Sequence, residues 1–468
     1  MNSKIKIKLQ LLIFTGIAAL ISIVSCSTTD QNPELAVFDN GTVNYKEYLD
    51  HYLLSTQYKP EKFPTVKNLK KIVELKAIEK MAVQEALEQG IDKDSSYISI
   101  VNNNERRLLF QKYVNSKFTD DVITDSLIQK FYNEYTPQYN MKYIMRPIIK
   151  SSSPKFIKAQ KDTIWEAYSM LKKGADFGKV AKKFSQDITT KNKNGEIGWI
   201  IVESMGDHIV RSVMDTLSEH SYSKPFRGYG GYYILYKGNH REVKVPPFEE
   251  IRGKIWKSLY HSRKPYIQDL LDQRFEELSE KYHYKLQEDK IKKVLKKVGY
   301  KSGISKYKDL NFSKLTDKDK ELKIAVYDGG FILLGDLFAN SKKAPINKLE
   351  FDKRIESIAR EHLLAKHAKE INLQNLGELP EQLKSMKTSL LRAILFQKKV
   401  KDKIDEQLKK SNAEKDPGKR EKLKNKLQKE YEDYLKSKYH FSFVEDNFDK
   451  AIELATEAKK ELNKKKSK

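Results

Sequence analysis

Three short stretches of this sequence recur, in the same order, in its second half. Residues 35–41 (LAVFDNG) are echoed at 324–330 (IAVYDGG), residues 108–114 (LLFQKYV) at 394–400 (ILFQKKV), and residues 281–284 (KYHY) at 438–441 (KYHF). The third echo is displaced by a much shorter interval than the first two, which indicates that the second copy lacks a segment present in the first. The sequence therefore predicts two copies of one module, with an insertion in the first copy only.

Both copies are expected to be mostly helical. The 468 residues include only 20 Gly and 13 Pro, and Lys, Glu and Leu dominate outside residues 140–245. An apolar content of 39% is too high for a disordered chain, and a charged content of 33% is too high for an integral membrane protein. The spacing of apolar residues predicts these helices: 44–57, 66–90, 94–118, 124–135 and 248–283.

The inserted segment, residues 140–245, has a different character. Strands are expected at 141–149, 195–201 and 232–237, where Ile, Tyr, Met and Gly are enriched. Helices are expected between them, at 155–173, 176–184 and 206–217. Pro246 and Pro247 end the segment. The alternation predicts a compact α/β unit of about one small domain's length.

The N-terminus predicts export. Residues 1–8 are basic, residues 9–24 are almost wholly apolar, and Cys26, the sole cysteine, follows Ser25. A basic region, a short apolar region and a small residue at the cut are typical of a secretory signal, and a cysteine after the cut resembles a bacterial lipobox. We therefore expect lipidation at Cys26 and anchoring to a membrane, the outer membrane rather than the inner one, facing the periplasm. The alternative is one N-terminal transmembrane anchor, although the apolar run is short for a span.

The chain is strongly basic. Its formal net charge is +25, and removal of the three lysines in residues 1–25, which hold no acid, leaves +22. Such an excess attracts polyanions, here acidic unfolded polypeptides or an anionic lipid surface. Export would separate the chain from nucleic acid, so no nucleic-acid partner is expected. The alternative is that the lysines only keep the helices soluble.

Several motifs of the insertion occur in a fixed order and spacing. They are GADFGKVAKKFSQD at 174–187, GEIGW at 195–199 and YGGYYIL at 229–235. Together they resemble the parvulin-type (PpiC-like) peptidyl-prolyl cis-trans isomerase domain, whose patterns are GxDFxxLAxxxSxD, GGxLGxF and YGYHIIxV. The flanking helical segments resemble the arms of the SurA- and PrsA-type exported foldases. The resemblance implies an α+β fold: a duplicated, mostly helical chaperone body with one inserted parvulin α/β domain.

The resemblance also implies a site for a proline-bearing peptide. The family lowers the barrier to rotation of X-Pro bonds, about 18–20 kcal/mol, without a cofactor or a covalent step. Both family histidines are replaced here, by Met145 and Tyr233, while the acidic position survives as Asp187. The resemblance assigns Asp187 and Tyr233 to catalysis. It assigns these residues to peptide binding: Met145, Trp199, Met205, Ile209 and Met214.

Two interpretations of this site stay open. The domain isomerises X-Pro bonds weakly through Asp187, Tyr233 and Met205, or it binds peptides without catalysis. Each residue also has a structural alternative. Asp187 is a candidate cap at a helix end, Met205 and Ile209 are candidate core residues, and Tyr233 is a candidate core tyrosine with its hydroxyl at the surface.

Other chemistry is not indicated. Glu361-His362 with His367 looks superficially like a metal motif, but the two histidines are five residues apart and do not share a helix face. We therefore expect no metal and no cofactor. Phosphate-binding loops, dinucleotide-binding glycine runs and nucleophile elbows are absent from the sequence, so nucleotide-dependent or hydrolytic chemistry is not expected.

The sequence predicts the following division of the chain: signal peptide 1–25, tether 26–34, first helical module 35–139 with 246–290, parvulin-like domain 140–245, linker 291–320, second module 321–448, and basic C-terminal helix and tail 449–468. The expected function is that of a membrane-tethered extracytoplasmic foldase that binds unfolded secreted or outer-membrane polypeptides. Two alternatives are a true isomerase whose main task is catalysis, and an assembly scaffold that binds one fixed partner.

Overall fold

The computed structural model describes residues 32–149, 152–301, 303, 305–339, 344–411 and 416–466. They divide into two compact units: the first unit holds residues up to Val101 and from Lys384 onward, and the second unit holds Asn102–Leu383. Cys26 and the predicted signal peptide lie outside the described residues. No helix in the described part of the chain has the length and apolar character needed to cross a membrane.

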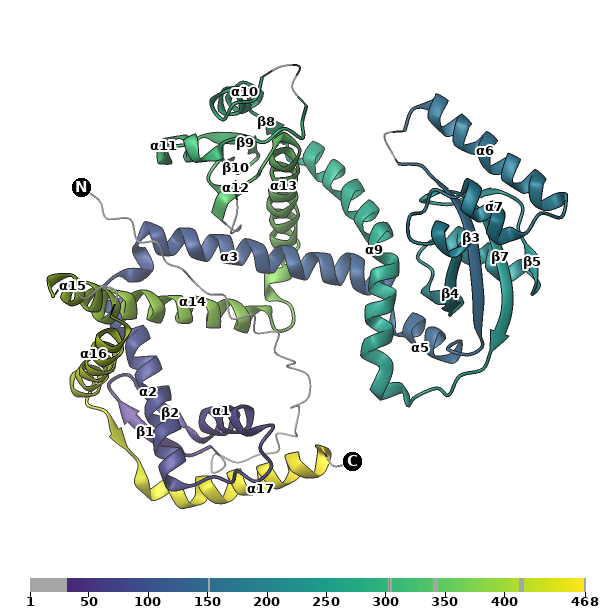
Figure 1. The fold of residues 1–468 in the computed structure, drawn as a ribbon. Helices are drawn as coiled ribbons and strands as arrows, with labels where there is room; N and C mark the ends of the chain where they lie inside the picture. The colour runs from purple at the N-terminus through teal and green to yellow at the C-terminus, as the bar shows by residue number, and fades with distance from the viewer. Residues whose placement is uncertain are drawn as a thin grey trace. The chain divides into compact units, whose positions relative to one another are not determined.

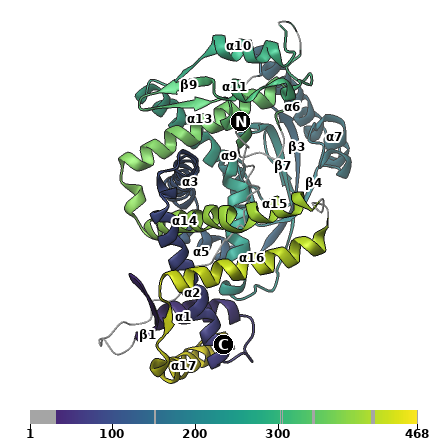
Figure 2. The same cartoon turned by 90° about the vertical axis from the view of Figure 1, so that its left-hand side faces the viewer.

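The first unit joins the two ends of the chain. From the N-terminal side it takes β1 (Glu34–Phe38), β2 (Gly41–Asn44), α1 (Tyr45–Thr56), α2 (Val66–Glu88) and η1 (Ile91–Lys93). From the C-terminal side it takes α15 (Asp402–Lys410), α16 (Pro417–Lys438), β11 (Ser442–Phe443) and α17 (Phe448–Lys466). In Figure 2, α1, α2 and α17 gather around β1. The helices α3 (Ser95–Val114) and α14 (Leu379–Phe396) each run from one unit into the other.

Local sequence signals explain where the first elements begin and end. Asn40 adopts a left-handed conformation (φ 59°) in the turn between β1 and β2, as expected for a tight hairpin turn. Asn44 then caps α1 by accepting from the Glu47 amide, while the Glu47 side chain accepts from the Asn44 amide. Thr65 caps α2 by accepting from the Asn68 amide. The tight turn and both helices agree with the sequence-based predictions.

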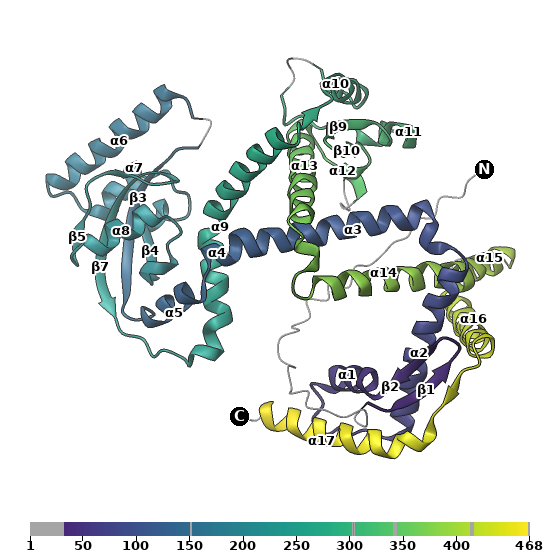
Figure 3. The ribbon, with the colours of Figure 1, turned by 180° about the vertical axis from the view of Figure 1, so that it is seen from behind.

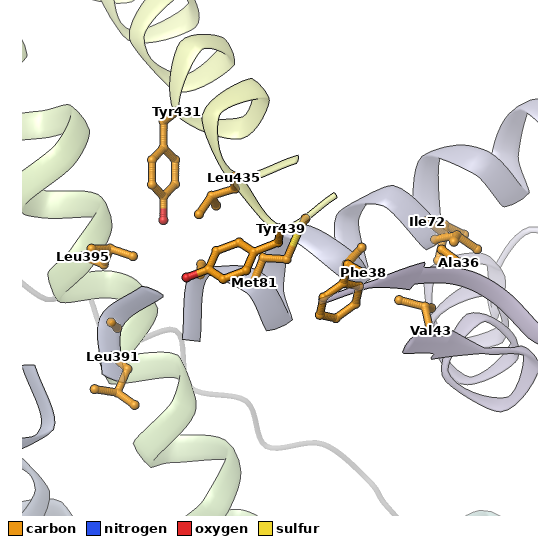
Figure 4. Close-up of a cluster of buried hydrophobic side chains, with 14 of the residues drawn as sticks. Ala36, Phe38, Val43, Ile72, Met81, Leu391, Leu395, Tyr431, Leu435 and Tyr439 are labelled. Carbon is orange, nitrogen blue, oxygen red and sulfur yellow. The ribbon is translucent and has the colours of Figure 1, made fainter. Parts of the chain in front are cut away.

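The core of the first unit combines side chains from both ends of the sequence. Figure 4 shows Phe38 and Met81, from the N-terminal segments, beside Tyr439, with Leu391 and Leu395 supplied by α14. Met81 and Leu395 are fully buried. Burial of these apolar side chains is what joins segments more than 300 residues apart.

The second unit contains a long helix that links two α/β parts. The helix, α9 (Phe248–Lys281), holds Pro265 in its interior and changes direction along its length (Figures 1 and 3). Beyond it lie β8 (Lys285–Leu286), α10 (Glu288–Lys297), α11 (Asp317–Lys320), β9 (Lys323–Tyr327), β10 (Gly330–Leu333), α12 (Asp336–Ala339) and α13 (Lys348–Glu370). Before the first α/β part, α5 (Asp125–Asn133) packs on α9.

The first α/β part, here called the insert domain (residues 138–241), is a twisted antiparallel sheet with helices on both faces. Its elements are β3 (Gln138–Pro147), α6 (Pro154–Lys172), α7 (Phe177–Phe184), β4 (Glu196–Ile200), α8 (His208–Thr216), β5 (Ser221–Tyr222), β6 (Phe226–Arg227) and β7 (Gly231–Arg241). The strand order is β4-β3-β7-β5, with β6 also pairing with β7. Because successive side chains of a strand alternate, Ile234 packs under α6 and α7 while Leu235 packs under α8.

The duplication predicted from the sequence is confirmed, and the two copies exchange strands. The first copy's hairpin, β1–β2, pairs with β11 of the second copy, while the second copy's hairpin, β9–β10, pairs with β8 of the first copy. The two sheets also share a contact between the pairing segment and the hairpin. His440 contacts Asp39 at 2.8 Å in one sheet, and His283 contacts Asp328 at 2.7 Å in the other. Both histidines adopt a left-handed backbone conformation.

This exchange groups the segments differently from the division drawn along the sequence. That division kept residues 35–139 with 246–290 and treated 321–448 as a separate module. In the structure each compact unit takes its hairpin from one copy and the pairing strand from the other. Such an exchange is possible because equivalent strands of two similar copies can pair within a copy or between copies.

Candidate functional site

The middle of β3 and β7 places two of the predicted site residues side by side. Met145 and Tyr233 are direct partners in the antiparallel register of the two strands. A Cβ atom built on Gly230 would lie 2.5 Å from the Tyr233 hydroxyl and 2.9 Å from the Met145 Cε atom. The ends of both side chains therefore converge over the backbone of Gly230, where a larger residue would collide with them.

The Tyr233 ring belongs to an aromatic and apolar surface that it forms with Met145, Met205 and Phe226, here called the wall. It stacks on Phe226 with ring centroids 5.8 Å apart and meets the edge of Tyr143 at 6.1 Å. Met205 belongs to the same cluster, on the face of the sheet covered by α8. Burial, reinforced by the charge of Asp207 and by Tyr143, raises the pKa of Tyr233 to about 12, so the hydroxyl keeps its proton at neutral pH.

The Tyr233 hydroxyl is a donor that has no acceptor in the part of the protein that the structure describes. No described residue forms a hydrogen bond with it, although its ring is packed on two sides. A phenolic hydroxyl in that position can donate to a carbonyl oxygen of a bound peptide. The wall therefore offers apolar contact and one directed hydrogen bond.

Asp187 is held in a dense set of hydrogen bonds. Its Oδ2 atom accepts from the Tyr143 hydroxyl at 2.7 Å, from the Thr189 hydroxyl at 2.6 Å, and from the Thr190 amide and hydroxyl at 3.0 and 2.5 Å. Burial acts to raise the pKa of Asp187, but these hydrogen bonds outweigh it and hold the pKa below the usual value. Asp187 is therefore an ionised anchor that fixes Tyr143, which in turn contacts Tyr233.

Buried charges fix the loop that carries Met205. The Met205 carbonyl accepts from Arg263 Nη1 at 2.7 Å and from Arg211 Nη1 at 2.5 Å. Arg263, on α9, also binds Glu203 at 2.9 Å, and Lys130, on α5, binds the other oxygen of Glu203 at 2.6 Å. Glu203 and Arg263 are 6% and 5% exposed. The apolar wall is thus attached to the helical part of the second unit by an ion-pair network.

The loop also touches α9 through its backbone. A Cβ atom on Gly206 would lie 2.1 Å from the Ser262 carbonyl oxygen, so no residue other than glycine fits without a shift of the helix or the loop. Asp207, the next residue, caps α8 by accepting from the Ile209 amide at 2.9 Å. Its second oxygen accepts from the Tyr229 amide at 2.5 Å. The wall is therefore preorganised from several sides.

The remaining predicted residues lie in different surroundings. Met214 is fully buried beneath the wall with Met141 and Leu235, so it supports the wall from inside. Ile209 is half-buried in the first turn of α8, and the cluster of described residues around Tyr233 does not include it. Trp199 lines a separate pocket formed with α5 and α9. The structure thus brings together Met145, Met205, Tyr233 and, through Tyr143, Asp187.

Sequence reasoning missed the residues that connect these groups. Tyr143 was detectable from the sequence. It lies two residues from Met141 and two from Met145 along β3, so the three side chains are expected on the same face of the strand. Phe226 lies in a two-residue strand that no periodicity reveals. Arg263 lies on a helix outside the inserted segment, where nothing in the sequence indicates contact with Met205. The Glu361-His362 pair serves other contacts: Glu361 binds Arg106, and His362 is buried against Tyr327.

This arrangement suits non-covalent chemistry on a peptide. It offers the apolar wall, the protonated hydroxyl of Tyr233 as a hydrogen-bond donor, and the hydrogen-bonded carboxylate of Asp187. Within the described residues, no group of three His, Cys, Asp or Glu side chains is placed to hold a metal ion. The rotation of an X-Pro bond requires neither bond cleavage nor proton transfer, only a site that favours the twisted amide over the planar one.

The sequence of this chain is similar to those of known rotamase and foldase proteins. The family model of the PPIC-type PPIASE (rotamase) domain matches residues 144–238. The "Foldase protein PrsA" of Caldanaerobacter subterraneus is 25% identical over 65% of this chain and 100% of its own length. A "Parvulin-like PPIase" of Rickettsia typhi is 23% identical over 55% of this chain and 91% of its own length. The solved structure of PrsA from Bacillus anthracis covers 48% of this chain and 97% of its own, at 19% identity and a TM-score of 0.24. Residues 144–238 are thus a parvulin-type rotamase domain, in a chain that resembles the PrsA foldases over most of its length.

Proposed function

We propose that this chain is a membrane-tethered, extracytoplasmic foldase that binds unfolded secreted or outer-membrane polypeptides. Its rotamase domain receives the proline-bearing segment of such a polypeptide. The proposal is supported by the family match at residues 144–238 and by the similarity to PrsA foldases. The signal-like residues 1–25 and Cys26 supply the export and the anchor in this proposal.

One observation carries the assignment of the site. The Tyr233 hydroxyl is protonated, lacks a protein acceptor among the described residues, and sits at the edge of the wall formed with Met145, Met205 and Phe226. A proline ring placed on this wall would bury apolar surface, and the hydroxyl would donate to a neighbouring peptide carbonyl. That hydrogen bond assists catalysis to the extent that it is stronger in the twisted amide than in the planar one.

A second function, peptide binding without catalysis, is favoured by a specific observation. Methionine stands at Met145, where the family has a histidine, and it cannot supply a ring nitrogen. Asp187 Oδ2 is occupied by four hydrogen bonds, so it holds Tyr143 in place instead of meeting the peptide. In this alternative the wall only retains the chain.

Proline-limited refolding of a cis-proline protein tests the two functions. If Tyr233 donates to the twisted amide, the purified protein accelerates refolding and Tyr233→Phe reduces the acceleration about ten-fold, the loss expected for one hydrogen bond at a reacting centre. Tyr232→Phe is the matched control, because Tyr232 is the next residue of β7 and its ring packs with the cluster on the opposite face. Equal acceleration by both variants would exclude a catalytic role for the Tyr233 hydroxyl.

Aggregation assays test the foldase function itself. The full protein is expected to suppress the aggregation of several unrelated unfolded proteins at near-stoichiometric amounts. Suppression for one partner alone would favour the scaffold alternative. If the protein neither suppressed aggregation nor bound proline-bearing peptides, the proposed function would be rejected.

A further inference from the structure

We propose that a second pocket, formed by α5, β4 and α9, binds a large apolar side chain followed by an acidic residue in an unfolded polypeptide. This inference rests on the proposed function, because it assumes that such polypeptides reach the chain. It adds a binding site that does not require proline. The site is defined by Phe131, Tyr135, Trp199, Lys254 and Ile255, and we call it the Trp199 pocket.

The walls of the Trp199 pocket are apolar and aromatic. Its volume is about 300 Å³, at the lower end of the range for ligand sites. Phe131 and Ile255 are buried at its sides, whereas Trp199 is 38% exposed. An exposed indole at the mouth of an apolar pocket offers a large contact area for a side chain that enters it. A leucine-sized or phenylalanine-sized side chain fits this volume and chemistry.

The charge at the pocket is positive and uncompensated. Lys254 is exposed at its edge, and no described carboxylate pairs with the Lys254 ammonium group. The Arg241 guanidinium lies over the Trp199 ring, 4.6 Å from its centroid, and it donates to the neutral Gln138 side chain. None of the residues that line the pocket is acidic. A carboxylate next to the inserted apolar side chain therefore has two cations within reach and no repelling group among the lining residues.

The pocket is also rigidly built. The loop that contributes Ile201 and Ser204 continues into the Glu203–Arg263 ion pair. On the other side, Ile251 and Ile255 lie one helical turn apart on α9, and both are buried. Because the walls are fixed before binding, little ordering of the protein opposes the entry of a side chain. The pocket therefore can retain a short segment of an unfolded chain next to the rotamase site.

Fluorescence anisotropy with a labelled, proline-free peptide that contains Leu-Leu-Asp tests the inference on the full-length protein. Lys254→Glu is expected to weaken binding about ten-fold, because it removes the cation and adds a repelling charge. Lys257→Glu is the matched control: it makes the same charge change on the same helix, at an exposed residue outside the pocket, and should alter affinity less than about two-fold. Ser258→Trp should abolish binding by filling the pocket, and a circular dichroism spectrum would verify its fold.

A charge-reversed peptide completes the test. Replacement of Asp by Lys in the peptide should weaken binding to the wild-type protein and restore binding to the Lys254→Glu variant. Equal affinities of the Lys254→Glu and Lys257→Glu variants would overturn the inference. The proposed function is tested separately: if proline-bearing peptides still bind and aggregation is still suppressed while the Leu-Leu-Asp peptide does not bind, only the Trp199 pocket fails.

Discussion

At the scale of single residues, the site depends on contacts that organise groups instead of reacting with the peptide. Asp187 could be identified from the family pattern, but its partners could not, because three of its four hydrogen bonds come from the turn that follows it and one comes from β3. Its carboxylate holds the Tyr143 hydroxyl, and the Tyr143 ring meets Tyr233. The catalytic role of Asp187 stays a prediction, and the structure adds that its carboxylate holds in place a neighbour that sequence reasoning overlooked.

The Tyr143–Asp187 hydrogen bond predicts a measurable change in the titration of Asp187. Tyr143→Phe removes one donor to the carboxylate, so the pKa of Asp187 should rise toward its ordinary value of 3.8. Carboxyl NMR across a pH titration would measure this shift. An unchanged pKa would show that the threonines alone determine the ionisation of Asp187.

The same contact predicts a pH-dependent stability difference. Because the pKa of Asp187 is lowered in the folded state, its stabilising contribution is present above the unfolded-state pKa, near 3.8, and is lost as the pH falls through the lower folded-state value. Tyr143→Phe should therefore cost about 1–2 kcal/mol of unfolding free energy at pH 7. The cost should shrink as the pH falls below 3.8. Urea denaturation at pH 7 and at low pH would check both values.

At the scale of elements, the sequence located most helices and strands within a few residues. The helix expected at 66–90 spans Val66–Glu88, and the strand expected at 141–149 spans Gln138–Pro147. Periodicity succeeds here because each element buries one face. It could not reveal the short π-helices at Asn115–Thr119 and Gln397–Lys401. A π-helix differs from an α-helix in its hydrogen-bond spacing, and its amino-acid composition does not show the difference. Nor could it reveal which element a buried charge contacts.

The ion pair between α9 and the Met205 loop predicts a large stability effect. Arg263→Met leaves the buried Glu203 with fewer donors and frees the Met205 carbonyl from one of its two arginines. The loss should be about 3 kcal/mol of unfolding free energy for the second unit, less than for an isolated buried pair because Lys130 still binds Glu203. Chemical denaturation would measure it.

Arg252→Met is the matched control for this change. Arg252 lies on the same helix and pairs with Asp125 at 2.5 Å, but both side chains are largely exposed. An exposed pair of this kind contributes less than about 1 kcal/mol. Similar losses for Arg263→Met and Arg252→Met would contradict the view that the buried network fixes the wall. Arg263→Met should in addition weaken the binding of proline-bearing peptides, which Arg252→Met should leave unaltered.

At the scale of the whole molecule, the order of the copies was predictable but their exchange was not. The echoes at 35–41 and 324–330 identify equivalent hairpins. Those at 281–284 and 438–441 identify equivalent segments that lead into a strand. Such matches are symmetric: they state which segments are alike, not which of two like partners pairs with which. The structure resolves this by connecting the hairpin of each copy to the strand of the other. An acidic residue binds the corresponding tyrosine in each unit: the buried Glu85 binds Tyr439, and the exposed Glu370 binds Tyr282.

The exchange predicts how a local defect spreads along the chain. Glu85 is 2% exposed and accepts from the Tyr439 hydroxyl at 3.0 Å and the Tyr434 hydroxyl at 3.1 Å, besides its ion pair with Lys438. Glu85→Gln removes the charge from these bonds, at a cost of about 1.5–3 kcal/mol. Hydrogen exchange should therefore accelerate in residues 439–444 and in residues 35–44, because β11 and β1 form one sheet.

The corresponding change in the second unit should produce the mirror pattern with a smaller acceleration, because Glu370 is exposed whereas Glu85 is buried. Glu370→Gln should accelerate exchange in residues 282–287 and 323–333, where β8 pairs with β9, and leave residues 439–444 as protected as before. Mass spectrometry of peptic fragments would follow all four segments at once. If Glu85→Gln instead accelerated exchange at 282–287 together with 35–44, each hairpin would be pairing within its own copy. The two variants therefore distinguish an exchanged pair of modules from two modules that fold separately, since only exchange links residue 85 to a strand more than 350 residues away.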